Sequence, residues 1–139
     1  MQLLERIHFL SRADKLKPVR DTVRALAQRM NCTAENIDCM VMAINEACMN
    51  VIQHAYGVQE DGEVVLEFWM DGDDLVIRIH DFAASVDKNK IKSRDLDDIR
   101  PGGLGVHLIH KMMDSVDYLD GQDGVGNMLQ MRKRMGEVK

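Results

Sequence analysis

The stretch Ile37–Tyr56 reads I-D-C-M-V-M-A-I-N-E-A-C-M-N-V-I-Q-H-A-Y. Successive residues of an α-helix are about 100° apart, so side chains that recur every three or four positions share one face. The apolar set with this spacing is Ile37, Val41, Ile44, Cys48, Val51 and Ala55. Glu46, Asn50 and His54 follow one another at intervals of four and form a polar stripe on another face. The stretch therefore predicts a core helix whose polar stripe is either a solvated edge or a row of ligand-binding side chains.

The composition of the whole chain is that of an ordinary soluble protein. It has 139 residues, of which 45% are hydrophobic and 29% charged, and this length predicts one domain, 1–139. The net charge of -5 argues against a nucleic-acid-binding protein. No apolar run approaches the roughly 20 residues of a membrane span, and no signal-peptide pattern is present, so we expect a cytoplasmic protein. Three cysteines match no zinc-binding motif and are expected to be reduced thiols.

Strand and helix patterns follow one another along the rest of the chain. Strands are expected at 3–10, 63–70, 75–80, 116–119 and 128–135, and helices from 15 or 18 to 30, over 37–56 and after 105. The Asp71–Asp74 turn makes the second and third strands a hairpin. This order predicts an α+β fold, a two-layer α/β sandwich whose mixed, mainly antiparallel sheet is covered on one face by helices.

Three separate pieces of sequence carry groups suited to a nucleotide. The first is the polar stripe of the long helix. The second is Asp81, at the end of a central strand, where a carboxylate can accept a hydrogen bond from a ligand amine. The third is Gly102-Gly103-Leu104-Gly105, where backbone N–H groups at a helix start can approach a phosphate. Each piece alone is more often a wet helix face or a simple turn, but their combination favours a nucleotide site with Mg²⁺.

Two of these pieces also resemble known motifs. E-A-C-M-N-V-I-Q-H-A-Y, at 46–56, resembles the N-box of the Bergerat-fold (GHKL-type) ATPases, the superfamily of gyrase, histidine kinases and the heat-shock chaperone. Its form is similar to that of the small stand-alone branch, the anti-sigma-factor serine-protein kinases. R-P-G-G-L-G-V-H-L-I-H-K-M-M-D, at 100–114, resembles the second glycine box of that branch and the helix after it. The resemblance covers nearly the whole chain and implies a histidine-kinase-like ATPase fold.

The resemblance also implies roles for individual residues. Asn50 would coordinate Mg²⁺ between the ATP phosphates, and Glu46 would be the general base for the acceptor serine. Asp81 would bind the adenine amino group, with Asn127 close to it, and His54 would lie near the phosphates. The remaining implied parts are the phosphate-binding turn Gly103, Leu104 and Gly105, and an ATP lid over 85–101.

Two positions depart from the family pattern. The first glycine box usually reads Asp-x-Gly-x-Gly/Pro, whereas this chain has Asp81-Phe82-Ala83-Ala84-Ser85, without glycine. Near the C-terminus the usual Gly-Thr pair is Gly126-Asn127. Both differences fall on the adenine side of the expected site, so they bear on nucleotide affinity rather than on the fold.

The resemblance implies a serine-protein kinase that works by partner switching. It would phosphorylate an anti-sigma-factor antagonist of the STAS type, sequester a sigma factor or another regulator, and form a homodimer. The alternative from another class is a non-catalytic interaction module with the same fold, which the altered glycine box motivates. A third interpretation is a histidine-kinase catalytic domain separated from its sensor, but no dimerisation helix pair with a phospho-acceptor histidine is recognisable.

Overall fold

The structure is a computed structural model that describes residues 1–83, 109–121 and 126–135. Five strands and two long helices make up most of it. Their bounds are β1 (Gln2–Leu10), α1 (Leu16–Arg29), α2 (Ala34–Ala55), β2 (Glu63–Asp71), β3 (Asp74–Asp81), β4 (Ser115–Asp120) and β5 (Asn127–Arg134). A short 3-10 helix, η1 (Ala13–Lys15), precedes α1, and residues 109–112 are helical. The second glycine box and the expected lid lie outside the described residues.

The five strands form one sheet in the order β1-β2-β3-β5-β4. All four strand pairings of the described chain are antiparallel, whereas the sequence predicted a mixed sheet. Strand β1 lies at one edge, and β3 lies in the centre between β2 and β5. The turn Asp71–Asp74 closes the β2–β3 hairpin, and Gly72 takes a positive φ of 61° there. Asp81, the last residue of β3, is thereby placed at the end of the central strand.

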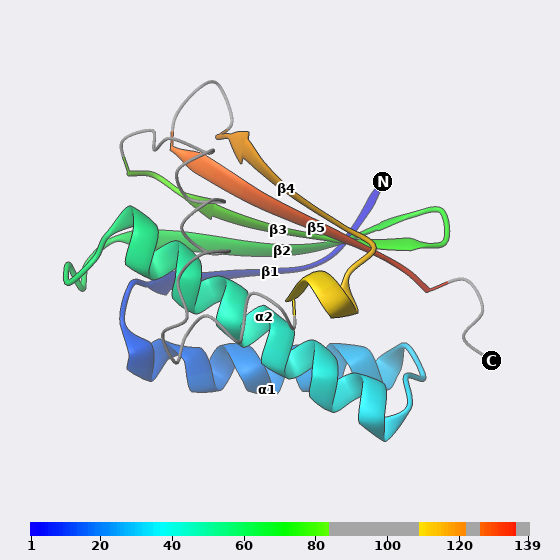
Figure 1. The fold of residues 1–139 in the computed structure, drawn as a ribbon. Helices are drawn as coiled ribbons and strands as arrows, with labels where there is room; N and C mark the ends of the chain where they lie inside the picture. The colour runs from blue at the N-terminus through cyan, green and yellow to red at the C-terminus, as the bar shows by residue number, and fades with distance from the viewer. Residues whose placement is uncertain (84–108, 122–125, 136–139) are drawn as a thin grey trace.

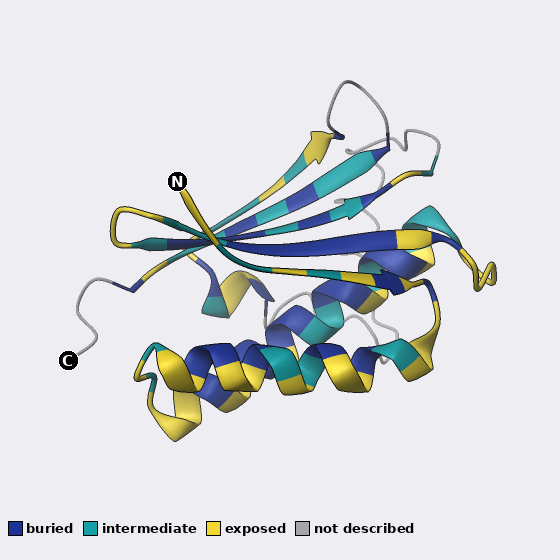
Figure 2. Cartoon of the chain, turned by 180° about the vertical axis from the view of Figure 1, so that it is seen from behind, coloured by how far each residue is buried: buried dark blue, intermediate teal, exposed yellow. Residues whose placement is uncertain are grey.

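Both long helices pack on the same face of the sheet, as Figure 1 shows. Figure 2 gives the view from behind, in which no helix of the described residues lies against the other face. The alternation along the strands produces this arrangement, because every second side chain of a strand points to the same face. The helix-facing side chains Leu66, Phe68, Ile77 and Met131 have no exposed surface. The two-layer sandwich predicted from the element order is confirmed.

Helix α2 contains the expected helix 37–56 except for its last residue, and it begins earlier, at Ala34. The hydroxyl oxygen of Thr33 accepts a hydrogen bond from the Asn36 backbone N–H at 3.2 Å, which satisfies an otherwise unpaired amide of the first turn. Gly57, with φ of 60°, follows the last turn. The apolar stripe is buried as expected, with Ile44 and Cys48 at 0% exposure, although Ala55 is only partly buried. Burial raises the pKa of the Cys48 thiol to about 12, so this cysteine is an inert core residue.

No helix within the described ranges combines the length and the apolar character needed to cross a bilayer.

Candidate functional site

Helix α2 presents Asn50 and His54 beside its buried stripe. The two residues are one helical turn apart, and both are partly exposed, whereas Val51 and Ile52 between them are buried. This alternation follows from the helical period, because a stripe offset from the core-facing stripe is only half covered by the sheet. Asn50 and His54 therefore lie at the border between the helix and the open space next to the sheet.

The opposite side of the same space is formed where β3 ends and β5 begins. Asp81 and Asn127 are register partners across these two strands, so their side chains lie next to each other. The Asn127 Nδ2 donates a hydrogen bond to Asp81 Oδ1 at 3.0 Å, and the Ala83 backbone N–H donates to the same oxygen at 3.1 Å. Asp81 is only 5% exposed. The carboxylate is thus fixed in orientation by groups on both sides of it.

Burial shifts the pKa of the Asp81 carboxyl above its ordinary value. Desolvation is the largest cause, and the hydrogen bonds from Asn127 and Ala83 oppose it only in part. A buried carboxylate that already accepts hydrogen bonds gains more from a further donor than an exposed one, because less water competes for it. The amino group of adenine is such a donor.

Replacement of Asp81 by asparagine is expected to weaken ATP binding roughly 10- to 100-fold, because a hydrogen bond to a charged group is worth about 1.5–3 kcal/mol. The folded protein should not lose stability at neutral pH. The raised pKa means that folding favours protonated Asp81, so its contribution to stability is present below the ordinary pKa of 3.8 and is lost as pH rises through the folded-state value. The amide that replaces the carboxyl in this variant does not titrate.

The free energy of unfolding of Asp81→Asn relative to wild type should therefore rise with pH above 3.8, and urea titrations at several pH values measure it. The exposed Asp117→Asn on β4 is the matched control for the removal of a carboxylate. A variant that loses stability relative to wild type as pH rises would contradict this account of Asp81.

Gly126 is required at the position where β5 begins. Its φ is 72°, and a Cβ at this residue would overlap the Asp81 carbonyl oxygen and crowd the Phe82 Cα. A side chain would therefore push the two strand ends apart and separate Asn127 from Asp81. The glycine of the Gly126-Asn127 pair keeps its structural function in this chain, although asparagine stands where threonine is usual.

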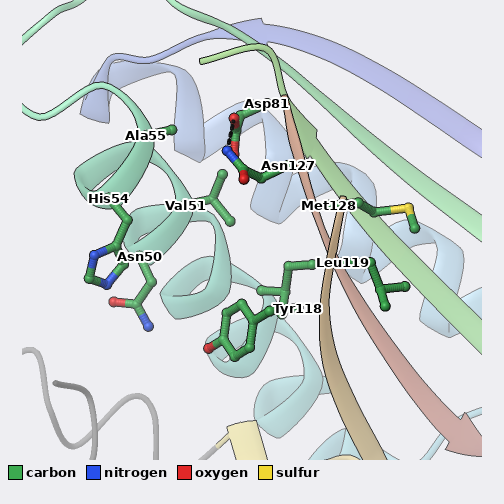
Figure 3. A pocket seen from close by; sticks show the side chains of 10 residues that line it. Asn50, Val51, His54, Ala55, Asp81, Tyr118, Leu119, Asn127 and Met128 are labelled. Carbon is green, nitrogen blue, oxygen red and sulfur yellow. Dashed lines mark hydrogen bonds between the residues drawn. The ribbon is translucent and has the colours of Figure 1, made fainter. Parts of the chain in front are cut away.

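A cavity of about 430 Å³, including its open mouth, joins the two sides. Figure 3 shows Asn50 and His54 on the helix side and the hydrogen-bonded Asp81 and Asn127 on the sheet side. The remaining lining residues are mostly apolar: Val51, Ala55, Tyr118, Leu119, Met128 and Leu129.

The sequence analysis identified the polar residues of this cavity but none of the apolar ones. Tyr118 and Leu129 are register partners on neighbouring strands, and the core buries Leu129 fully and Tyr118 in part. Both lie in strands expected from the sequence, and nothing in the strand pattern distinguished them from core residues. An aromatic ring and a leucine that line the same cavity as a buried carboxylate form the kind of surface on which a flat base can pack.

Of the other predicted site residues, Glu46 lies one turn before Asn50 on α2 and is partly exposed. It is not among the residues that line the cavity, so the acceptor contact expected for it would lie outside the cavity. Gly103, Leu104 and Gly105 lie outside the described residues, as does the lid 85–101, and their roles stay predictions.

The Asn50 side chain fits a magnesium ion whose other ligands are phosphate oxygens and water. Within the described residues no group of three or more His, Cys, Asp or Glu side chains could hold a metal by itself. Mg²⁺ usually takes only one or two protein ligands in nucleotide sites and completes its shell with phosphate oxygens and water. The Asn50 amide oxygen, at the rim of the cavity, is a hard ligand of this kind.

A family model described as the histidine kinase-like ATPase domain matches residues 9–133. The chain belongs to this family. The serine-protein kinase RsbW of one Bacillus cereus strain is 32% identical over 130 residues, a match that covers 86% of this chain and 80% of the relative. The RsbW protein of Bacillus thuringiensis subsp. konkukian matches to the same extent.

These matches also place the chain in the anti-sigma serine-protein kinase branch of the family, so its enzyme class is that of an ATP-dependent protein serine/threonine kinase. The catalytic domain of the histidine kinase ThkA, in a nucleotide-free form, has the same fold. It aligns with a TM-score of 0.52 over 95% of this chain and 98% of that domain, at 10% sequence identity. The recognition made from the two motifs is confirmed.

Proposed function

We propose that the chain binds Mg-ATP in the cavity between α2 and the sheet and transfers the γ-phosphoryl group to a serine of a partner protein. The observation that supports this most is the convergence of Asn50 and His54 with the buried Asp81–Asn127 pair on one cavity. These groups come from three elements that are far apart in sequence, and they match the polar groups that a nucleotide requires.

Each group has a distinct task in this proposal. Asp81 accepts a hydrogen bond from the adenine amine, and its orientation is held by Asn127. Asn50 provides an amide oxygen for Mg²⁺, which neutralises phosphate charge when it is bound. His54 lies one turn further along α2 and can donate to a phosphate oxygen. Positioning and charge neutralisation supply most of the catalysis of phosphoryl transfer, so this set is sufficient in outline.

Glu46 would accept the proton of the attacking serine. In the transfer step the serine oxygen forms a bond to the γ-phosphorus while the bond from that phosphorus to the bridging oxygen of ADP breaks. The serine proton passes to the Glu46 carboxylate, and the ADP oxygen takes the electron pair of the broken bond. Gly103, Leu104 and Gly105, with the lid 85–101, would bring backbone N–H groups to the phosphates.

The partner in this proposal is an anti-sigma-factor antagonist of the STAS type, and the sequestered protein is a sigma factor or a comparable regulator. The support is the similarity to proteins named serine-protein kinase over 86% of this chain. A cytoplasmic location stays a prediction from the sequence.

We also propose a homodimer, for which the face of the sheet without helices is the candidate surface (Figure 2). Trp69 and Arg78 lie on this face, with the Arg78 guanidinium 5.9 Å from the Trp69 ring centre. Tryptophan and arginine are the residue types enriched in protein interfaces. Sedimentation equilibrium measures the mass, and a monomer at all micromolar concentrations would exclude this dimer.

The test of the function is an incubation of the protein with γ-labelled ATP, Mg²⁺ and a purified STAS-domain protein from the same organism. We expect label on a serine of the STAS protein and none when Mg²⁺ is chelated. Absence of transfer to every STAS protein of that organism, under conditions in which ATP binds, would contradict the proposed substrate.

The non-catalytic alternative draws on the first glycine box, which has no glycine here. The structure weakens the physical reason for it. Among the described residues Asn31 is the one non-glycine residue with a positive φ, so Ala83 adopts an ordinary backbone conformation. Its N–H still reaches the Asp81 carboxylate. Alanine is therefore compatible with the backbone of Asp81, Phe82 and Ala83, which we call the Asp81 corner.

A further inference from the structure

Tyr56 joins the helix side of the cavity to its sheet side. It is the first residue after α2, two positions beyond His54. Its hydroxyl donates a hydrogen bond to the Glu63 carbonyl oxygen at 2.7 Å and accepts one from the Phe82 backbone N–H at 2.9 Å. Phe82 directly follows Asp81. One hydroxyl thus connects the end of α2 to the start of β2 and to the end of β3.

The ring that carries this hydroxyl is itself held in place. A Cβ at Gly62 would overlap the Tyr56 ring, so the ring lies directly on the Gly62 backbone. Gly62 in turn receives a hydrogen bond at its carbonyl oxygen from the Ser11 N–H at 2.8 Å, and its own N–H donates to Ser11 Oγ at 3.0 Å. The tyrosine hydroxyl therefore has little freedom to follow Phe82 if that residue moves.

Hydrogen bonds from Asn127 and Ala83 orient the Asp81 carboxylate, and the chain that follows Asp81 leaves the sheet at once. The pairing of β3 with β2 ends at Asp81, whose partner is Val64 near the start of β2. Phe82 is 48% exposed and is no longer part of a strand. Among the described residues, the hydrogen bond from the Phe82 N–H to Tyr56 holds the chain directly after Asp81, while the Ala83 N–H bonds back to the carboxylate.

We propose that Tyr56 is a positioning residue of the nucleotide site: by holding the Phe82 backbone to the end of α2, it fixes the Asp81 carboxylate toward the cavity and sets the preference for a 6-aminopurine. This inference rests on the proposed function, because it assigns Asp81 to the adenine amine. The tyrosine does not touch the nucleotide. Its effect passes through the backbone of the Asp81 corner, where this chain has Ala83 in place of the usual glycine.

Tyr56→Phe is the test, because it removes the hydroxyl and keeps the ring on Gly62. We expect the affinity for Mg-ATP, measured by calorimetry, to fall about 3- to 10-fold, as the loss of one hydrogen bond predicts. The affinity for Mg-ITP, measured by displacement, should change less than about twofold, because inosine has no amino group for Asp81 to bind. The preference for ATP over ITP should therefore shrink.

Ser11→Ala is the matched control. It removes a hydroxyl that bonds the Gly62 N–H and the Gln59 carbonyl oxygen in the same loop, and neither of these hydrogen bonds involves Phe82. This variant should be destabilised to urea and yet keep the ATP-to-ITP ratio of wild type. If the Tyr56 hydroxyl only stabilised the fold, Tyr56→Phe would behave like Ser11→Ala: it would be less stable to urea and would keep the ATP-to-ITP ratio of wild type.

An unchanged ATP-to-ITP ratio in Tyr56→Phe would overturn the proposal while leaving the proposed function intact. Absence of ATP binding by the wild-type protein would overturn both. Amide hydrogen exchange gives a second measurement that needs no nucleotide: the Phe82 N–H should lose protection in Tyr56→Phe and keep it in Ser11→Ala. Unchanged protection at Phe82 would contradict the role of the hydroxyl even if ATP affinity fell.

Discussion

Glu46→Gln is expected to lower the rate of phosphoryl transfer about 10²- to 10⁴-fold, the range that general base catalysis contributes. The amide keeps the shape of the side chain and cannot accept the serine proton. Affinity for Mg-ATP should stay within about twofold of wild type, because Glu46 does not line the cavity. Single-turnover transfer of label from γ-labelled ATP to the acceptor measures the rate, and calorimetry measures the affinity.

The control is Glu35→Gln, an exposed carboxylate in the first turn of the same helix, which should transfer at the wild-type rate. An equal loss of transfer in both variants would mean that the charge of α2, and not a base at Glu46, supports the reaction. Wild-type transfer in Glu46→Gln would remove Glu46 from the catalytic role.

Asn50→Ala should reduce Mg-ATP affinity by about 100-fold, because even the residues that only support a metal ligand commonly contribute 10- to 100-fold. The loss should be specific to the metal. In the presence of a chelator, the variant and the wild type should bind ATP with similar weak affinity, since the remaining contacts to adenine are the same. Titration of ATP with and without Mg²⁺ separates the two contributions.

Asn36→Ala is the control for this prediction, because the Asn36 side chain is exposed in the first turn of α2 and only its backbone N–H contacts the N-cap. It should bind Mg-ATP like wild type. A magnesium dependence in Asn50→Ala as strong as that of wild type would exclude Asn50 as the metal ligand.

The elements of the fold were largely predictable from local sequence. The α2 stripe, its Thr33 cap and its Gly57 end follow from helical periodicity and capping, and the β2–β3 hairpin follows from its Asp-Gly turn. The strand order β3-β5-β4 was not predictable, because periodicity shows which face a strand buries but not which strand it pairs with. The predicted sheet was mixed and mainly antiparallel, and the described pairings are all antiparallel; this detail also depends on strand pairing.

The site was predictable in its polar groups and not in its shape. Asn50 and Asp81 stood out because a polar helix stripe, a strand-end carboxylate and a glycine-rich turn occur together in one chain. Tyr118 and Leu129 did not, because a residue that lines a cavity has the same alternation as one that fills the core. The close approach of Gly126 to the Asp81 backbone also depends on strand register and was visible only in three dimensions.

The connection of Tyr56 to Phe82 shows the same limit. Tyr56 belonged to the quoted motif, but its two hydrogen-bond partners are 7 and 26 residues further along the chain. No pattern in the sequence joins these positions. The contact arises because the end of α2, the start of β2 and the end of β3 meet at one end of the sheet, next to the cavity.

The central claim is that the cavity between α2 and the sheet is a magnesium-dependent ATP site. Calorimetric titration of the wild-type protein with Mg-ATP tests it most directly, with Asp81→Asn and Asn50→Ala titrated in parallel. The account predicts saturable binding that weakens when Mg²⁺ is removed and when either side chain is replaced. No binding at millimolar Mg-ATP, or binding that neither substitution affects, would contradict it.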